Sequence, residues 1–185
     1  DFDIRNQFGI QNDEIILLYV GRIVGYKKPF LACDILRAVL DKGIKCRMFM
    51  IGKGALQPKL LSYIEHQNLA DSILYKESVP YSEMYRYMAA SDCFINLSSI
   101  EIFGMTILEA MYYSLPVVAH VAPGPNDIIE NGVNGYLCDS DDPEKWSEAI
   151  LQALKRRNEL ANNAHNSIMK KYIWDNIADE FLSLM

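Results

Sequence analysis

Short apolar runs alternate with longer amphipathic segments along this chain. Residues 15–20 read Ile-Ile-Leu-Leu-Tyr-Val, and unbroken runs of this kind are typical of parallel strands that are buried on both faces. Similar runs predict strands at residues 44–51, 73–75, 93–97 and 116–121. Between and after them we expect helices at residues 30–40, 57–67, 82–88, 105–113, from 143 onward, 159–172 and 174–185. Strands that alternate with helices predict an α/β domain with a doubly wound parallel sheet.

Several helix boundaries carry specific signals. Pro29 is well placed to open a helix, and Asp142-Pro143-Glu144 combines a capping residue, a first-turn proline and an early acidic residue. The helix that follows has an apolar stripe formed by Trp146, Ala149, Ile150, Ala153 and Leu154. We expect Ser82 to cap the helix at 82–88, and residues 123–127 to form a turn into a short helix.

Residues 98–118 combine a loop, a helix and a strand around two glutamates. Gly104 permits close backbone approach of a ligand, and the helix after it begins at the carboxyl edge of the sheet, where free amides favour an anion such as phosphate. Glu101 and Glu109 have seven residues between them, and Glu109 lies roughly 7 to 8 Å inside the helix. Ionised carboxylates accept hydrogen bonds from hydroxyl-rich groups such as a sugar or a ribose. On spacing alone, both glutamates could equally be solvated surface charges.

A basic loop follows the first strand. Gly21 ends that strand, and Arg22 and Lys27 lie at its carboxyl end, where open α/β sheets bind ligands. A guanidinium fork and an ammonium suit a diphosphate, although a solvated basic loop would have the same sequence. Residues 52–54, Gly-Lys-Gly, occupy the same place after the second strand and could form a plain tight turn.

Residues 99–118 resemble the signature of the retaining GT-B glycosyltransferases of family 4, the group 1 type. That signature has two glutamates around a Phe-Gly pair, then Glu-Ala-Met and Pro-Val-Val. The matching residues are Glu101, Phe103, Gly104, Glu109, Ala110, Met111, Pro116, Val117 and Val118. The resemblance extends over about residues 8–174 and implies one Rossmann-like half of a GT-B fold, the carboxyl-terminal, donor-binding half. The parent enzyme would transfer a hexose-type sugar from a nucleotide diphosphate sugar to an acceptor with retention of configuration.

The resemblance also implies roles for individual residues. The donor diphosphate would be bound by Arg22, Lys27 and the amides of residues 104–106. Glu109 would accept hydrogen bonds from the ribose hydroxyls. Glu101 would act at the catalytic centre by holding and orienting the transferred sugar. The implied donor-binding positions are Gly21, Arg22, Lys27, Gly54, Val79, Phe103, Gly104, Met105, Thr106 and Glu109. The chain departs from the family pattern at Lys28 and Ser114, where glycine is common, and near Asp127, where a glutamate is common.

The resemblance divides the chain into three parts. Residues 1–13 would connect two domains, residues 14–172 would form the donor-binding domain, and the helix at 173–185 could pack toward an amino-terminal acceptor-binding domain. A chain that begins at Asp1 is consistent with a piece of a longer protein, and such a piece is expected to be inactive in transfer. A lipid-linked or polysaccharide acceptor is plausible by family analogy. Two other functions fit the same fold: a non-hydrolysing sugar-nucleotide epimerase and a catalytically silent nucleotide-binding or interaction module.

Composition excludes some classes of function. A formal charge of −6 over 185 residues argues against broad nucleic-acid binding, which needs a basic face. The scattered Cys33, Cys46, Cys93 and Cys138 favour buried, reduced thiols of a cytoplasmic protein, and neither they nor the three histidines have metal-ligand spacing. The family resemblance likewise implies no metal or other cofactor, with protein cations in its place. No apolar run approaches the roughly 18 residues needed to span a bilayer, so any membrane association of the parent enzyme would be peripheral.

The tyrosines near residue 80 have two interpretations. Tyr81, Tyr85, Tyr87 and Met88 could form a stacking surface, but aromatic residues at helical spacing more often belong to a core.

Overall fold

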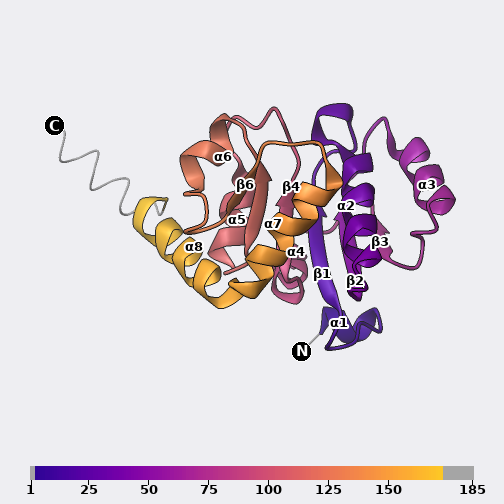
Figure 1. Cartoon of the computed structure of the whole chain (residues 1–185), viewed down its shortest axis with the longest axis horizontal. Coiled ribbons are helices and arrows are strands. Elements are labelled where there is room, and N and C mark those ends of the chain that lie inside the picture. The colour runs from indigo at the N-terminus through magenta and orange to yellow at the C-terminus, as the bar shows by residue number, and fades with distance from the viewer. Residues whose placement is uncertain (1–2, 173–185) are drawn as a thin grey trace.

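The computed structural model describes residues 3–172 of the chain. Six strands form one parallel sheet in the order β3-β2-β1-β4-β5-β6 (Figure 1). They are β1 (Ile15–Val20), β2 (Cys46–Ile51), β3 (Ile73–Lys76), β4 (Cys93–Asn96), β5 (Val117–His120) and β6 (Tyr136–Cys138). The order runs outward in both directions from the neighbours β1 and β4, so the sheet is doubly wound, as predicted.

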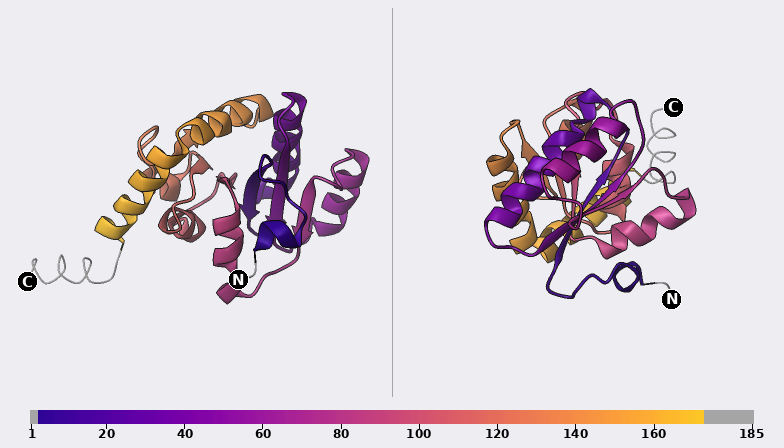
Figure 2. Two further views of the ribbon diagram at one scale, coloured as in Figure 1. Left: turned by 90° about the horizontal axis from the view of Figure 1, so that it is seen from below. Right: turned by 90° about the vertical axis from the view of Figure 1, so that its right-hand side faces the viewer.

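Helices cover both faces of the sheet. They are α1 (Ile4–Gln7), α2 (Pro29–Asp41), α3 (Gln57–His66), α4 (Tyr81–Ala90), α5 (Met105–Tyr112), α6 (Pro123–Ile128), α7 (Pro143–Lys155) and α8 (Arg157–Lys171), with a short 3-10 helix η1 (Gly25–Lys27). Helices α2 and α7 pack against each other in front of the sheet in Figure 1. The right-hand view of Figure 2 looks from the β3 side and shows helices on both sides of the strands.

The strands are mainly apolar because each face of the sheet has its own core. In β1, Leu17 and Tyr19 join one buried cluster, together with α2, α3 and Trp146 of α7. Ile16 and Leu18 point the other way and join a second cluster with α4, α5 and α8. Side chains alternate between the faces of a strand, so a strand buried on both faces shows no polar alternation. The apolar runs were therefore interpreted correctly.

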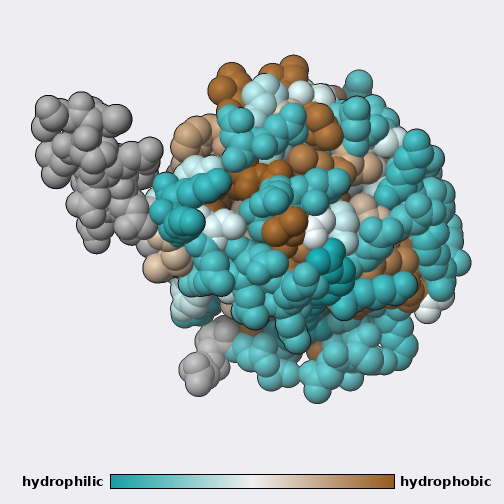
Figure 3. Space-filling model, turned by 60° about the vertical axis from the view of Figure 1, so that its left-hand side comes forward, coloured by the Kyte–Doolittle hydropathy of each residue, from teal (hydrophilic) through white to brown (hydrophobic). Residues whose placement is uncertain are grey.

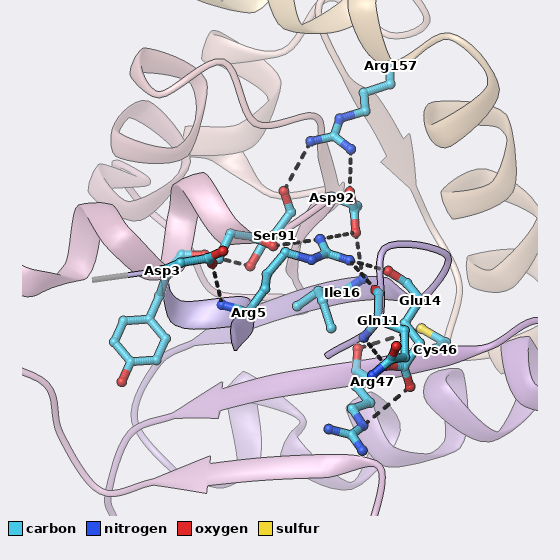
Figure 4. Close-up of polar contacts among 12 residues, drawn as sticks. Asp3, Arg5, Gln11, Glu14, Ile16, Cys46, Arg47, Ser91, Asp92 and Arg157 are labelled. Carbon is cyan, nitrogen blue, oxygen red and sulfur yellow. Dashed lines mark hydrogen bonds and ion pairs between the residues drawn. The ribbon is translucent and has the colours of Figure 1, made fainter. Parts of the chain in front are cut away.

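Residues 1–13, predicted as a connector, contain α1, which the sequence pattern did not predict. Asp3 caps this helix by accepting from the Arg5 amide. The Arg5 guanidinium then reaches the core and donates to the Ala90 carbonyl at 3.0 Å and to the Asp92 carboxylate at 3.3 Å. In Figure 4, Asp92 lies between Arg5 and Arg157, and it also accepts from the Ile16 amide at 2.7 Å. This segment is thus fixed to the domain that follows it.

Some local predictions need correction. Ser82 is not a helix cap, because α4 already begins at Tyr81. The N-cap residue is Pro80, whose backbone is not helical, and no side chain of the described residues caps the helix. Residues 123–127 do not lead into a helix but form α6, since Pro123 already has the backbone angle that suits a first helical position. The helix predicted at 173–185 lies outside the described residues.

The tyrosines of α4 divide between core and surface. Tyr87 and Met88 are buried in the second cluster, as the core interpretation requires. Tyr81 is 81% exposed and Tyr85 is 43% exposed, so the core interpretation is wrong for these two residues.

Candidate functional site

A cleft of about 360 Å³ lies at the carboxyl edge of the sheet, where the loops after β1 and β4 face each other. Its lining residues are Val20, Gly21, Arg22, Tyr26, Lys27, Glu101, Phe103, Gly104, Met105 and Thr106. Open α/β sheets bind ligands at this point because the strand order reverses there and the two loops separate. The fold therefore brings together most of the residues that the sequence singled out, although they come from two segments about 75 positions apart.

The amino end of α5 opens into this cleft. Gly104 is the N-cap, with φ 84° in the left-handed region that favours glycine, and no side chain caps the helix. Among the described residues, the amides of Gly104, Met105 and Thr106 donate to no acceptor. Uncapped amides and the positive end of the helix dipole attract an anion.

Lys27 and Glu101 form an ion pair across the cleft, with 2.6 Å between Nζ and Oε2. Each residue is held by a separate contact: the Tyr19 hydroxyl donates to the Lys27 carbonyl at 3.0 Å, and the Gly124 amide donates to the Glu101 carbonyl at 2.8 Å. A lysine ammonium has three donors, so Lys27 can bind a further acceptor while it keeps Glu101. Both side chains are about four-fifths buried, at 21% and 17% exposure.

Arg22 is exposed at the mouth of the same cleft. Within residues 3–172 its side chain has no hydrogen-bond or ion-pair partner. A free guanidinium beside uncapped amides is available for a planar, bidentate contact with phosphate oxygens.

Glu109 lines a second cleft of about 460 Å³. Its other lining residues are Tyr81, Phe103, Met105, Leu108, Tyr112, Tyr113, Ile168 and Tyr172. Phe103 and Met105 line both clefts, so the two adjoin and one ligand could span them. Glu109 is half-buried, and burial raises its pKa. Glu109 is therefore partly buried rather than fully solvated.

Gly54 and Val79, two further predicted donor contacts, line neither cleft. A Cβ at Gly54 would lie 2.4 Å from the Ile23 carbonyl oxygen, so close packing of the loops after β1 and β2 accounts for this glycine. Val79 borders a separate hollow with Lys76 and Arg86. Their roles in binding stay predictions.

Other residues near the cleft escaped the sequence interpretation. Lys28 adopts φ 50° and ψ 53°, in the left-handed region that favours glycine, and its ammonium binds Asp141. Gly124 packs against the loop before α5, where a Cβ would lie 2.7 Å from the Phe103 carbonyl carbon. Pro-Gly-Pro at 123–125 was a visible signal, but it was interpreted only as a turn.

The loop before α5 and the start of α5 carry exposed apolar side chains. Exposed fractions are 64% for Ile100, 80% for Ile102, 59% for Phe103 and 57% for Met105. Figure 3 shows hydrophobic residues at the top and near the middle of a mainly hydrophilic face. The charged cleft thus has one apolar border, formed by Ile100, Ile102, Phe103 and Met105, which we call the apolar rim.

Metal-binding clusters and membrane-spanning helices are absent from residues 3–172. Among residues 3–172 no cluster of three or more His, Cys, Asp or Glu side chains could hold a metal ion. Every helix in the described part of the chain is too short or too polar to traverse a membrane. The four cysteines are buried and free, as predicted, and burial raises the pKa of the Cys33 thiol to about 12.

The fold and the cleft define a Rossmann-like α/β domain with an anion-suited helix start at the point where the strand order reverses. The sequence profile of the family described as "Glycosyl transferases group 1" matches residues 1–171. The chain belongs to this family.

Curated relatives are similar over nearly the whole chain. Poly(ribitol-phosphate) alpha-N-acetylglucosaminyltransferase of Staphylococcus aureus (strain COL) is 26% identical, over 99% of this chain and 40% of that protein. Alpha-monoglucosyldiacylglycerol synthase of Streptococcus pneumoniae is 31% identical, over 82% of this chain and 34% of that protein. The chain therefore spans less than half the length of these relatives.

Solved structures show the same fold. S. aureus TarM, solved as a mutant with Fondaparinux, alpha-GlcNAc-glycerol and UDP, has a TM-score of 0.83 and 26% identity, over 93% of this chain and 35% of that one. Anabaena HepE in complex with UDP-glucose also has a TM-score of 0.83, at 22% identity, over 98% of this chain and 52% of that one, which supports the fold alone. The predicted carboxyl-terminal half of a GT-B fold is confirmed.

Proposed function

We propose that this chain is the donor-binding domain of a retaining glycosyltransferase, which transfers a hexose-type sugar from a nucleotide diphosphate sugar to an acceptor. The observation that carries the proposal is the charged cleft, in which Arg22 and the Lys27–Glu101 pair surround the uncapped amides at the start of α5. The names of the relatives supply the sugar class, since they describe transfer of N-acetylglucosamine or glucose units.

The diphosphate occupies the cleft under this proposal. Arg22 forms a bidentate contact with its oxygens, Lys27 supplies a point charge, and the amides of residues 104–106 donate from the helix end. These donors stabilise the charge that develops on the leaving diphosphate as the glycosidic bond breaks. Protein cations thus do the work that a bound divalent metal would do elsewhere, and we propose that no metal is required.

The sugar and the nucleoside lie on opposite sides of the diphosphate. Glu101, oriented by Lys27, accepts hydrogen bonds from sugar hydroxyls and fixes the anomeric carbon relative to the leaving group. Glu109, in the adjoining cleft, accepts from the ribose hydroxyls. Because Glu109 faces the ribose, the two carboxylates do not act as the acid and nucleophile pair of a glycoside hydrolase. The alpha linkages in the relatives' names support retention from an alpha-linked donor.

The acceptor is bound by a part of the parent protein beyond this chain. We propose that an amino-terminal domain faces the apolar rim of the cleft and presents a lipid-linked or polysaccharide acceptor. We also propose a cytoplasmic parent enzyme, with at most peripheral membrane contact. This chain alone would then bind donor but transfer little or no sugar.

Calorimetric titration with UDP, GDP, ADP and their common sugar conjugates tests the donor site. We expect one nucleotide to bind, and Arg22→Ala and Glu109→Ala each to weaken it at least tenfold, about 1.4 kcal/mol. Lys59→Ala, an exposed lysine of α3 outside both clefts, should bind like the parent.

Three other results would contradict the proposal. Absence of binding to every nucleotide, in this chain and in the longer parent, would refute donor binding. Parent-like affinity in both variants would refute the assigned residues. Conversion of the nucleotide sugar to its epimer without an acceptor would favour an epimerase.

A further inference from the structure

The hydroxyl of Tyr81 contacts Glu109 from a different helix. Tyr81 is the first residue of α4 and Glu109 lies inside α5, and the Tyr81 Oη donates to Glu109 Oε1 at 3.3 Å. Both residues line the 460 Å³ cleft. Tyr81 is 81% exposed, so packing of its ring in the core does not explain its presence.

We propose that Tyr81 is a positioning residue that holds the Glu109 carboxylate toward the cleft for contact with the ribose hydroxyls of the donor. The inference rests on the proposed function and adds a residue to it. Tyr81 acts through Glu109, and its hydroxyl need not touch the donor.

In the described part of the chain, the contact with Tyr81 is the one side-chain hydrogen bond that restrains the Glu109 carboxylate. Within residues 3–172 Glu109 has no ion pair and no other side-chain hydrogen bond. A glutamate has several rotatable bonds, and an unrestrained one loses conformational entropy when it binds a ligand. A hydrogen-bond donor on another helix fixes one carboxylate oxygen of Glu109. The second oxygen remains free to accept a hydrogen bond from a ribose hydroxyl.

The charge state of Glu109 depends on the same contact. Burial raises the pKa of Glu109, and the hydrogen bond from Tyr81 opposes that rise by stabilising the ionised form. The negative charge of Glu109 in turn raises the pKa of the Tyr81 hydroxyl. Loss of the Tyr81 hydroxyl should therefore raise the pKa of Glu109 further.

Other titratable groups lie near Glu109 but farther from it than Tyr81 does. Tyr112 and Tyr113 from α5 and Tyr172 after α8 line the same cleft, and the His165 ring packs against Tyr112. The charged residues of the adjoining cleft are Arg22, Lys27 and Glu101. None of these groups makes a hydrogen bond or ion pair with the Glu109 side chain in the described structure.

Affinity for a nucleotide sugar, measured by calorimetry between pH 5 and 8, tests the inference. The probes are UDP-glucose, UDP-N-acetylglucosamine, GDP-mannose and ADP-glucose, because a sugar-linked diphosphate does not titrate in this range. The variants are Tyr81→Phe, Glu109→Gln and the control Tyr85→Phe. Tyr85 lies one turn further along α4, and its hydroxyl accepts from Arg86 outside both clefts.

The expected result has two parts. Tyr81→Phe weakens binding about three- to tenfold at pH 7.5, the effect of one hydrogen bond to a charged group that is partly exposed. Its affinity also begins to fall at a higher pH than in the parent, because Glu109 is protonated earlier. Glu109→Gln binds weakly without this fall, and Tyr85→Phe matches the parent in affinity and pH dependence. His165→Asn should keep the pH dependence of the parent, which would exclude His165 as the source of the fall in affinity.

Two outcomes would overturn the inference in distinguishable ways. Parent-like affinity and pH dependence in Tyr81→Phe, with a parent that binds, would remove the role of Tyr81 and leave the donor site intact. A parent that binds none of the four nucleotide sugars would refute the proposed function, and the inference with it.

Discussion

At the scale of single residues, Glu109 shows a conflict between stability and binding. It is a half-buried carboxylate without a cationic partner in the described structure, and burial raises its pKa above the ordinary 4.5. The folded domain therefore holds its proton to a higher pH than the unfolded chain does. As pH rises from about 4.5 through the folded pKa, ionisation costs the folded state stability. A residue retained at such a cost is a candidate for function.

Glu109→Gln should therefore stabilise the domain at neutral pH while it weakens donor binding. We expect a modestly higher Tm at pH 7, by up to about 2 °C, because burial penalises only the ionised carboxylate. The difference should vanish below about pH 4.5, where Glu109 is neutral in both states. Thermal unfolding at several pH values checks this, and a variant less stable than the parent at pH 7 would contradict it.

Individual residues also show how far the sequence predicts the site. Gly21, Arg22, Lys27, Glu101 and residues 103–106 meet in one cleft because all follow β1 or β4, whose carboxyl ends are adjacent. A core position was favoured for Tyr81 because helical spacing cannot tell a buried tyrosine from an exposed one at the first position of a helix. The Gly-Lys-Gly sequence around Gly54 resembled a ligand-binding turn. The close contact between Gly54 and Ile23 depends on packing between two loops, which no local sequence pattern encodes.

At the scale of elements, Asp92 joins three parts of the chain. It is 7% exposed and accepts from the Ile16 amide of β1, from Arg5 of α1 and from Arg157 of α8. Buried carboxylates are retained where paired charges and amides replace their lost hydration. This network fixes residues 3–13 and the start of α8 to the amino edge of the sheet (Figure 4).

Asp92→Asn should destabilise the domain by about 3 kcal/mol, because two guanidinium groups would lose their buried counter-charge. Urea unfolding measures this as a lower midpoint with an unchanged slope. The matched control is Asp13→Asn, which breaks an exposed pair with Lys45 and should shift the midpoint much less than Asp92→Asn does. Equal effects of the two substitutions would show that the Asp92 network is not a structural clamp.

Elements were easier to predict than their ends. The strands are mainly continuous apolar runs because both faces of the sheet are buried, and most helices show an amphipathic period. Helix α1 has four residues, too few to show a period, and it depends on Asp3 and Arg5 contacts that span up to 87 positions. The start of α4 was misplaced because a serine near a proline looks like a cap in sequence, whereas the backbone turn at Pro80 decides it.

At the scale of the whole molecule, the strand order brings the candidate binding residues together at one point of the sheet's carboxyl edge. The loops after β1 and β4 diverge from the centre of the sheet, and α5 points its uncapped amino end into the gap. The apolar rim beside this point has no cover among the described residues. A donor site that becomes complete when a second domain closes over it is consistent with a chain that spans 40% of the first relative named above.

The most direct test of the central claim is an amide NMR titration of the uniformly labelled chain with the nucleotide sugar that calorimetry identifies. We predict the largest shifts at residues 22 and 104–106, because these residues line the cleft proposed for the diphosphate, and smaller shifts near Glu109. Amides beside the separate hollow formed by residues 136–140 and α7 should not move. Shifts concentrated there, with residues 104–106 unaffected at saturation, would contradict the donor-binding account.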